Sequence, residues 1–343
     1  MKLIKYVLRI RTVDNTKWGG KKMTGNREVA SCLKRMRRKL EGAINQTQIK
    51  DVVTVAQDLG YPLKYDDTFL YLLSGSSAFV GGSLLYLDLL NTGVTLPLFL
   101  LFGFLVFVPL MWTHVRRQAI AFLSDEIYLK NQVIYHGLTE ESTTSAYSQG
   151  LLGSFLEFKR GNHSRRFTSV MQINNSFLEE GHFFKFEYVE RRRSIGRERN
   201  SATNVVDRKF NRCGIVIPFE KSSQLAVISD GNFTYADTYQ PASLVFRHHF
   251  NSSAKNVHQL AKFLTPSLVE EIVILGEELS GLNIEVNDYS QLCISCSDID
   301  VLSVDGREFG LDNPTEFKNE LGLSAGATKL NLLLTFLSKL DRN

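Results

Sequence analysis

Two long apolar runs dominate the hydrophobic pattern of this chain. Residues 69–90 carry a single charge, Asp88, and residues 94–112 carry none; three residues, 91–93, separate the runs. An α-helix rises about 1.5 Å per residue, so each run roughly matches a hydrocarbon layer about 30 Å thick. The pattern therefore predicts a transmembrane helical hairpin over residues 69–112, in preference to a buried helical hairpin of a soluble protein.

Small residues recur in the first run at a spacing that suits close packing of helices. Ala78 and Gly82 are four residues apart, as are Ser77 and Gly81. This small-xxx-small spacing lets two membrane helices approach each other, and Gly103 in the second run is the expected receiving position. We expect the hairpin to pack along these residues, and the same face would allow a homo-oligomer to form.

A basic, amphipathic segment precedes the first run. Between residues 27 and 59, apolar residues at helical spacing predict one or two helices, with the clearest stripe at Val29, Leu33, Met36 and Leu40. The opposite face carries Lys34, Arg35, Arg37, Arg38 and Lys39. Either this helix lies on anionic lipid, or it packs on a soluble domain and exposes its basic face to water. We predict a basic, mainly helical region over residues 1–68, with Met1 or Met23 as its start.

Charge is unevenly distributed, although the formal net charge is only +4. Residues 1–67 carry 15 Lys and Arg against 7 Asp and Glu, and the remaining residues carry 25 against 29. Arg116 and Arg117 directly follow the second run and complete the predicted membrane-surface basic set, whereas the loop between the runs has no Lys or Arg. The positive-inside rule then predicts a multi-pass protein of the cell inner (plasma) membrane with both termini in the cytoplasm.

Beyond the second run the pattern changes from helix to strand. Residues 113–150 are predicted to continue the second helix to about Gln132 and then to form a linker. Alternating apolar residues predict strands within residues 155–158, 167–173, 183–189, 213–219, 225–228 and 244–250.

Helical spacing returns toward the C-terminus. Thr265 and Pro266 are expected as the N-cap and the first residue of an amphipathic helix. A strand hairpin is predicted within residues 284–296. Further helices are predicted within residues 253–263 and 330–340, and another is predicted to start at Asn313-Pro314. This order predicts the α+β class: a cytoplasmic, mainly antiparallel β domain with C-terminal helices over residues 151–343.

The soluble part combines a Phe-rich β region with two short sequences, Phe246-Arg-His-His-Phe250-Asn251 and Leu264-Thr-Pro266. Behind two apolar runs, this combination resembles a bacterial membrane-protein family known only as a domain of unknown function, in which paired N-terminal spans precede a soluble α+β domain. The resemblance covers residues 151–300 best. It implies an architecture and a membrane location, and it supplies no catalytic residues.

One serine lies in a pattern typical of hydrolases. Gly322-Leu-Ser324-Ala-Gly326 matches the G-x-S-x-G nucleophile elbow, which needs a strand before the serine and a histidine after it. The residues before Ser324 have a helical pattern, and all seven histidines precede it. A turn between helices is therefore the favoured interpretation, and catalysis by Ser324 is a minority alternative.

Cysteine and histidine pairs are the other candidates for chemistry. Cys293 and Cys296 have redox or zinc spacing but lie in a predicted strand, so their thiols are expected on opposite faces, one in the core and one outward. His248 and His249 would also point apart on a strand. We expect no metal ligands and no cofactor.

An arginine-rich segment between two predicted strands is the most prominent polar feature. It contains Arg191, Arg192, Arg193, Arg197 and Arg199. In a strand-connecting loop these side chains would hold an anionic group or bind a partner. Nucleic acid is disfavoured because the segment has no aromatic residue for base stacking, and a solvated loop without a ligand is the alternative.

Together these features favour a non-enzymatic integral membrane protein. The hairpin is expected to anchor a cytoplasmic protein-binding domain, a scaffold or adaptor, at the inner membrane. The expected partners are the lipid bilayer, a protein of unknown identity and anionic lipid head groups. The alternatives are a membrane-bound serine hydrolase that uses Ser324 and a membrane-disrupting effector whose hairpin oligomerises.

Overall fold

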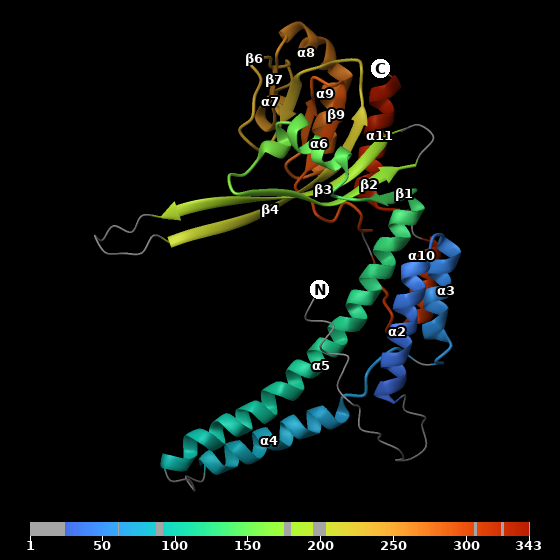
Figure 1. Ribbon diagram of the computed structural model, residues 1–343, viewed down its shortest axis with the longest axis vertical. Coiled ribbons are helices and arrows are strands. Elements are labelled where there is room, and N and C mark those ends of the chain that lie inside the picture. The colour runs from blue at the N-terminus through green and yellow to red at the C-terminus, as the bar shows by residue number, and fades with distance from the viewer. Residues whose placement is uncertain are drawn as a thin grey trace, which may run out of the picture. The chain divides into compact units, whose positions relative to one another are not determined.

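The fold is α+β, as the sequence predicts, with one large antiparallel sheet and many helices (Figure 1). The computed structural model describes residues 25–60, 62–86, 92–174, 180–194, 204–304, 307–323 and 326–342. The chain divides into two compact units, which are Met1–Asn131 with Arg307–Ser324, and Gln132–Gly306 with Ala325–Asn343.

The first unit is helical throughout its described elements. These are α2 (Asn26–Gly42), α3 (Gln46–Gln57), α4 (Thr68–Tyr86), α10 (Pro314–Leu323) and α5 (Thr92–Tyr135), whose C-terminal end belongs to the second unit. The rings of Tyr128 on α5 and Phe317 on α10 stack with their centroids 6.1 Å apart. The prediction that the second apolar helix continues to about Gln132 is confirmed.

The predicted N-terminal amphipathic helices correspond to α2 and α3. Val29, Met36 and Leu40 are buried as predicted, whereas Leu33 is only half-buried and Cys32 is fully buried beside the same stripe. Burial of this face against the other helices of the unit supplies the hydrophobic stabilisation that short helices lack in water.

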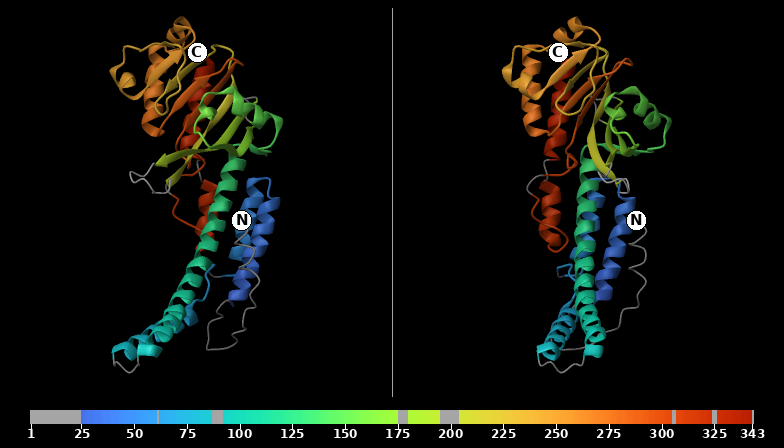
Figure 2. Two further views of the ribbon diagram at one scale, coloured as in Figure 1. Left: turned by 60° about the vertical axis from the view of Figure 1, so that its left-hand side comes forward. Right: turned by 90° about the vertical axis from the view of Figure 1, so that its left-hand side faces the viewer.

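The two apolar helices α4 and α5 run alongside each other (Figures 1 and 2). Within the described residues, one helical segment, Leu100–Tyr135, is long and apolar enough to cross a membrane, judged by length and composition only. The apolar part of α4, Thr68–Leu84, is shorter. On α5, Leu100, Phe104 and Phe107 are each more than 60 % exposed. The two-span hairpin therefore stays a prediction.

Small residues of α4 do face α5, but only one of the two predicted pairs does so. Ser77 is buried, and a Cβ at Gly81 would lie 3.1 Å from the side chain of Phe102. Among the described residues, and apart from their own stretch of helix, Gly82 and Gly103 have no heavy atom within 4 Å of an added Cβ. The prediction that Gly82 and Gly103 lie in the contact between the two helices is therefore wrong. The reason is that α4 turns the face that carries Ser77 and Gly81 toward α5.

The described strands of the second unit form one sheet in the order β1-β2-β3-β4-β9-β8-β5-β7-β6. Every pair of adjacent strands in this order is antiparallel. The strands are β1 (Leu138–Glu141), β2 (Ser164–Ile173), β3 (Gly181–Ser194), β4 (Asn204–Pro218), β5 (Leu225–Ile228), β6 (Asp237–Thr238), β7 (Asn251–Ala254), β8 (Asn283–Val286) and β9 (Gln291–Cys296).

Both faces of this sheet are covered. One face packs in a single apolar core with α7 (Leu244–His249), α8 (Val257–Phe263), α9 (Pro266–Glu278) and α11 (Thr328–Arg342). On the other face, α6 (Ala146–Ser154) and the 3₁₀ helix η1 (Glu157–Lys159) cover a second cluster. There the ring of Phe158 meets those of Phe167, Phe184 and Phe186 edge-on, with centroids 4.9–5.1 Å apart.

The C-terminal half contains both confirmed and wrong predictions. The Thr265 hydroxyl accepts a hydrogen bond from the backbone of Leu268 and caps α9 as predicted, and β8 and β9 form the predicted hairpin. Residues 244–250, predicted as a strand, instead form α7. The reason is that Phe246 and Phe250, four residues apart, are both buried, while Leu244 is 74 % exposed.

Two predictions before β2 are also wrong. Residues 155–158 are not a strand but lead into η1, because Phe155 and Phe158, three residues apart, both enter the aromatic cluster. The predicted linker to residue 150 contains β1 and the start of α6, whose N-cap Ser145 accepts a hydrogen bond from the backbone of Ser148.

The thiols of Cys293 and Cys296 lie on opposite faces of β9, as predicted. Cys293 belongs to the aromatic cluster and Cys296 to the larger core, so both are buried. The prediction of an outward thiol is wrong because α6 and η1 cover the second face of the sheet.

Candidate functional site: a basic ribbon and its buried anchor

Strands β3 and β4 continue beyond the sheet as a two-stranded ribbon (Figure 1). The pairing of β2 with β3 ends at Val189, and the pairing of β9 with β4 begins only at Cys213. From Glu190↔Arg208 to Ser194↔Asn204 the two strands pair only with each other. We call residues 190–194 and 204–208 the basic ribbon.

The structure corrects the position of the arginine-rich segment. Arg191, Arg192 and Arg193 lie on β3 within the basic ribbon and not on a loop, because each has a cross-strand partner on β4. Arg197 and Arg199 lie outside the described residues. A strand holds the first three arginines at fixed register, which a solvated loop does not.

The basic ribbon carries a net positive charge. It contains four arginines, with Arg208 the fourth, against the two carboxylates of Glu190 and Asp207. Both guanidinium contacts of Arg191 to Asp207 are 2.7–2.8 Å long, whereas Arg192 lies 3.6 Å from Glu190 and is mostly exposed. The sequence analysis did not single out Arg208, which reaches this surface only through strand pairing.

Two valines add an apolar element to the basic ribbon. Val205 and Val206 are each about half exposed, at 51 % and 50 %. Val206 lies directly opposite Arg192 and shares its face with Arg208, two residues further along β4. An exposed strand with both apolar and cationic side chains is a surface that another extended chain can pair with.

A tight turn fixes the root of the ribbon on the β3 side. The Asn162 side chain donates to the carbonyl of Arg191 at 3.0 Å and accepts from its amide at 2.7 Å. Gly161 precedes it with φ +74°, and a Cβ there would lie 2.8 Å from the carbonyl oxygen of Val189. Only glycine lets the turn come this close to the strand.

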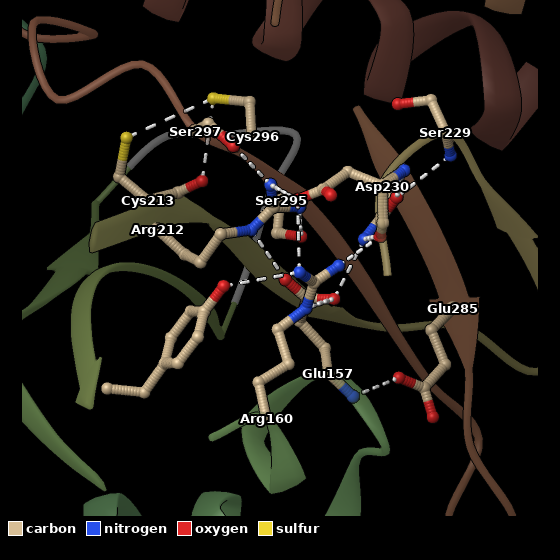
Figure 3. A network of polar contacts seen from close by, with 12 residues as sticks. Glu157, Arg160, Arg212, Cys213, Ser229, Asp230, Glu285, Ser295, Cys296 and Ser297 are labelled. Carbon is tan, nitrogen blue, oxygen red and sulfur yellow. Dashed lines mark hydrogen bonds and ion pairs between the residues drawn. The ribbon is translucent and has the colours of Figure 1, made fainter. Parts of the chain in front are cut away.

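A buried ion-pair network holds the β4 side of the root (Figure 3). Arg212 of β4 is 1 % exposed, and its Nε donates to Oε1 of Glu157 at 2.6 Å. Its two terminal nitrogens donate to the hydroxyls of Ser297 at 2.6 Å and Ser295 at 2.8 Å. Arg212 thus connects β4 to η1 and to β9 with charge-assisted hydrogen bonds.

A second arginine shares the same carboxylate. Arg160 Nε donates to Oε2 of Glu157 at 3.0 Å, and Arg160 Nη1 donates to Asp230 at 3.0 Å. The amide of Asn283 donates to the same Glu157 oxygen at 2.9 Å and to the carbonyl of Asp230 at 2.8 Å. Two cations therefore face two carboxylates, and both oxygens of Glu157 are occupied.

Glu285 on β8 extends the network to the start of η1. Its carboxylate accepts from the backbone amides of Leu156 at 2.8 Å and Glu157 at 2.9 Å, and from the Tyr235 hydroxyl at 3.3 Å. Burial and the nearby Glu157 charge raise the pKa of Glu285, the hydrogen bonds lower it, and the net result is a pKa of about 7. A carboxyl that titrates near neutral pH therefore secures this segment to the sheet.

The network follows from alternation along the strands. In β8, Ile284 and Val286 enter the larger core. Asn283 and Glu285 alternate with them along the strand and must therefore face the other side of the sheet. Sequence reasoning missed these residues; the signal was a polar residue at every second position of a short apolar strand. Because the charged groups are all engaged with one another, the arrangement suits mechanical attachment better than catalysis.

The other predicted basic residues lie in the first unit. Lys34, Arg35 and Arg38 are exposed on α2, and Arg37 reaches Glu126 at 3.9 Å. On α5, Arg116 pairs with Asp67 at 2.9 Å, and Arg117 donates to the Tyr71 hydroxyl at 2.7 Å.

Ser324 lies outside the described residues. The segment before it is α10, a helix that ends at Leu323, whereas a nucleophile elbow follows a strand. Within the part of the chain that is described, no group of three or more His, Cys, Asp or Glu side chains is arranged to hold a metal ion.

Comparisons with protein families, curated proteins and solved structures found no match for this chain. The resemblance to a two-span bacterial family therefore stays a prediction.

Replacing Arg212 by methionine should destabilise the second unit strongly. The variant leaves the Glu157 carboxylate buried without its closest cation, and breaking a buried pair in this way typically costs about 3–5 kcal/mol. Urea unfolding of the full chain in mild detergent, followed by circular dichroism, measures the loss. Glu157→Gln/Arg212→Met should recover part of it, and Arg166→Gln, at an exposed ion pair, should change stability by less than about 1 kcal/mol. If Arg212→Met lowers the free energy of unfolding by as little as Arg166→Gln does, the Arg212–Glu157 pair does not hold the second unit together as described.

Stability should also depend on pH through Glu285. Its folded-state pKa is raised above the ordinary value, so the folded state binds the proton more tightly than the unfolded state. The resulting stabilisation is complete at low pH and is lost as pH rises through about 7, by at most about 3 kcal/mol. We expect wild type to lose stability relative to Glu285→Gln between about pH 5 and about pH 8. Parallel pH profiles of the two proteins would contradict this.

Proposed function

We propose that this protein is a non-enzymatic membrane adaptor, whose α4–α5 hairpin anchors it in the inner membrane and whose basic ribbon binds an acidic, extended segment of a partner protein in the cytoplasm. The observation that carries the proposal is the basic ribbon, a positively charged pair of strands that continues beyond its sheet while a buried network holds its root.

The anchor is supported by the exposed apolar surface of α5. The exposed fractions of Phe104, Phe107 and Leu110 are between 41 % and 66 %. Exposure of this much apolar surface costs free energy in water and is favourable in hydrocarbon. Arg116 and Arg117 follow directly, as cytoplasmic flanks do under the positive-inside rule. The same helix continues to Tyr135, and β1 begins three residues later, at Leu138.

An acidic protein segment suits the basic ribbon better than other occupants. Residues 204–208 of β4 have no strand neighbour on the β9 side within the described residues, so their backbone is available for strand addition. A second copy would bring another ribbon of net positive charge against this one. The described part of the ribbon has no aromatic side chain on which bases would stack, which disfavours single-stranded nucleic acid.

A photo-cross-linking amino acid placed at Val206 tests the proposal in cells. We expect one discrete adduct with a protein, because Val206 is half exposed at the centre of the basic ribbon. Adding Arg192→Gln and Arg208→Gln should reduce the adduct at least about tenfold, since the carboxylates of the partner would lose the two guanidinium groups that bind them. Immunoblotting and mass spectrometry measure the adduct.

Two controls separate the ribbon from general charge effects. Arg247→Gln/Lys255→Gln removes the same charge from exposed positions elsewhere in the second unit and should leave the adduct unchanged. The cross-linker at Leu244, which is 74 % exposed, should not give the same adduct. No protein adduct from Val206, an adduct with a second copy of the chain, or one insensitive to Arg192 and Arg208 would contradict the proposal.

A further inference from the structure

We infer that a cleft in the first unit binds the head group of a membrane phospholipid, with its phosphate on Lys64 and Arg117 and its amine on Glu308 and Asp312. The ligand class is therefore a phosphoethanolamine head group. This inference rests on the proposed membrane anchoring and adds a lipid-binding site to it.

The cleft has the size of a small-molecule site. Its volume is about 540 Å³, and its walls come from residues 63–67, from the α5 residues 117–124 and from residues 307–312. Ligand pockets commonly measure about 300–1,000 Å³ and combine apolar walls with a few polar groups. Here Leu63, Ile120 and Phe309 supply apolar wall beside the charged residues.

The position of the cleft along the helices matches a head-group layer. Asp67, which lines it, is the residue before the first residue of α4, and Arg117 lies five residues beyond Trp112 on α5. Trp112 and Tyr71 are the aromatic residues at this end of the apolar stretches, and such residues concentrate at membrane–water interfaces. The cleft therefore begins where the apolar stretches of both helices end, which is the expected depth of lipid phosphates.

Two of the cations at the cleft already have carboxylate partners. Arg116, beside it, pairs with Asp67 at 2.9 Å, and its guanidinium lies 5.1 Å from the ring centroid of Tyr65. Arg307 pairs with Asp125 and lies 5.2 Å from the ring centroid of Tyr128. These two arginines stabilise the walls and are not available for a ligand.

The other two cations are available. Arg117 donates to the Tyr71 hydroxyl at 2.7 Å but has no carboxylate within ion-pair distance among the described residues. Lys64 is exposed and also forms no ion pair with a described carboxylate. An arginine fork beside a lysine is a common arrangement for binding phosphate oxygens. The Tyr71 contact orients Arg117 without neutralising it.

Acidic residues of the cleft decide between classes of head group. Glu308 and Asp312 are exposed in the cleft and form no ion pair within the described part of the chain. They would repel a head group that carries only negative charge. A primary ammonium attached to the phosphate instead gives each carboxylate a charged hydrogen-bond donor, which the quaternary ammonium of choline cannot provide.

Native mass spectrometry of the full chain tests the inference. The protein is reconstituted in phosphatidylcholine vesicles, extracted in mild detergent and titrated with phosphatidylethanolamine, phosphatidylglycerol or inorganic phosphate. We expect one retained phosphatidylethanolamine per chain. Lys64→Gln/Arg117→Gln should weaken its binding at least about tenfold, whereas Arg247→Gln/Lys255→Gln, with the same charge change outside the cleft, should not.

A second variant tests the choice of head group. Glu308→Gln/Asp312→Asn should abolish the preference for phosphatidylethanolamine over phosphatidylglycerol while a bound phospholipid is still observed. Equal wild-type binding of phosphatidylethanolamine and phosphatidylglycerol, or displacement of the lipid by inorganic phosphate, would overturn the inference. Flotation of each variant with the vesicles is measured separately, before extraction. A wild-type chain that does not float refutes the membrane anchor itself. A wild-type chain that floats but retains no lipid refutes only the head-group site.

Discussion

A buried charge must be fully partnered, and this constraint determines how the second unit is held together. Arg212 and Glu157 are each 1 % exposed and 55 residues apart in sequence. Their pairing requires η1 to lie on the sheet, and it requires Ser295 and Ser297 to face Arg212. Removing either Arg212 or Glu157 would leave the other as a desolvated charge, so these segments are coupled far more strongly than their short lengths suggest.

The same coupling holds the root of the basic ribbon in place. A two-stranded ribbon is marginally stable by itself, because it buries little apolar surface. Here Arg212 fixes one strand at the root and Asn162 fixes the other. The ribbon therefore presents its arginines at a defined spacing, which reduces the ordering entropy that a flexible arginine-rich loop would lose on binding.

What the sequence could predict depended on how local the determining interactions are. The helices α2, α3 and α9 follow from 3.6-residue periodicity and from the cap at Thr265, which are local signals. Residues 244–250 were mispredicted because an apolar pattern so short fits both a strand and one helical turn, and only burial of Phe246 with Phe250 decides. The network was invisible because Glu157 and Arg212 meet only through the tertiary fold.

The basic ribbon was partly visible in the sequence. The arginine cluster indicated an anion-binding or partner-binding feature, but its strand conformation required the cross-strand residues of β4. The cleft beside α5 was not visible at all, because Lys64 and Arg117 are 53 residues apart and reach the same cavity with residues from beyond position 306. Long-range contacts of this kind have no periodic signature in a single sequence.

The proposed function and the head-group site both depend on the membrane anchor. Carbonate extraction combined with thiol labelling tests this anchor and its orientation most directly. All four native cysteines are buried, so Ile299→Cys introduces one exposed thiol at a position that is 66 % exposed. After alkaline carbonate extraction, we expect the protein to stay with the membranes. We also expect a membrane-impermeant maleimide to label it only after the cells are broken. Release by carbonate would contradict the anchor, and labelling of intact cells would contradict the cytoplasmic orientation.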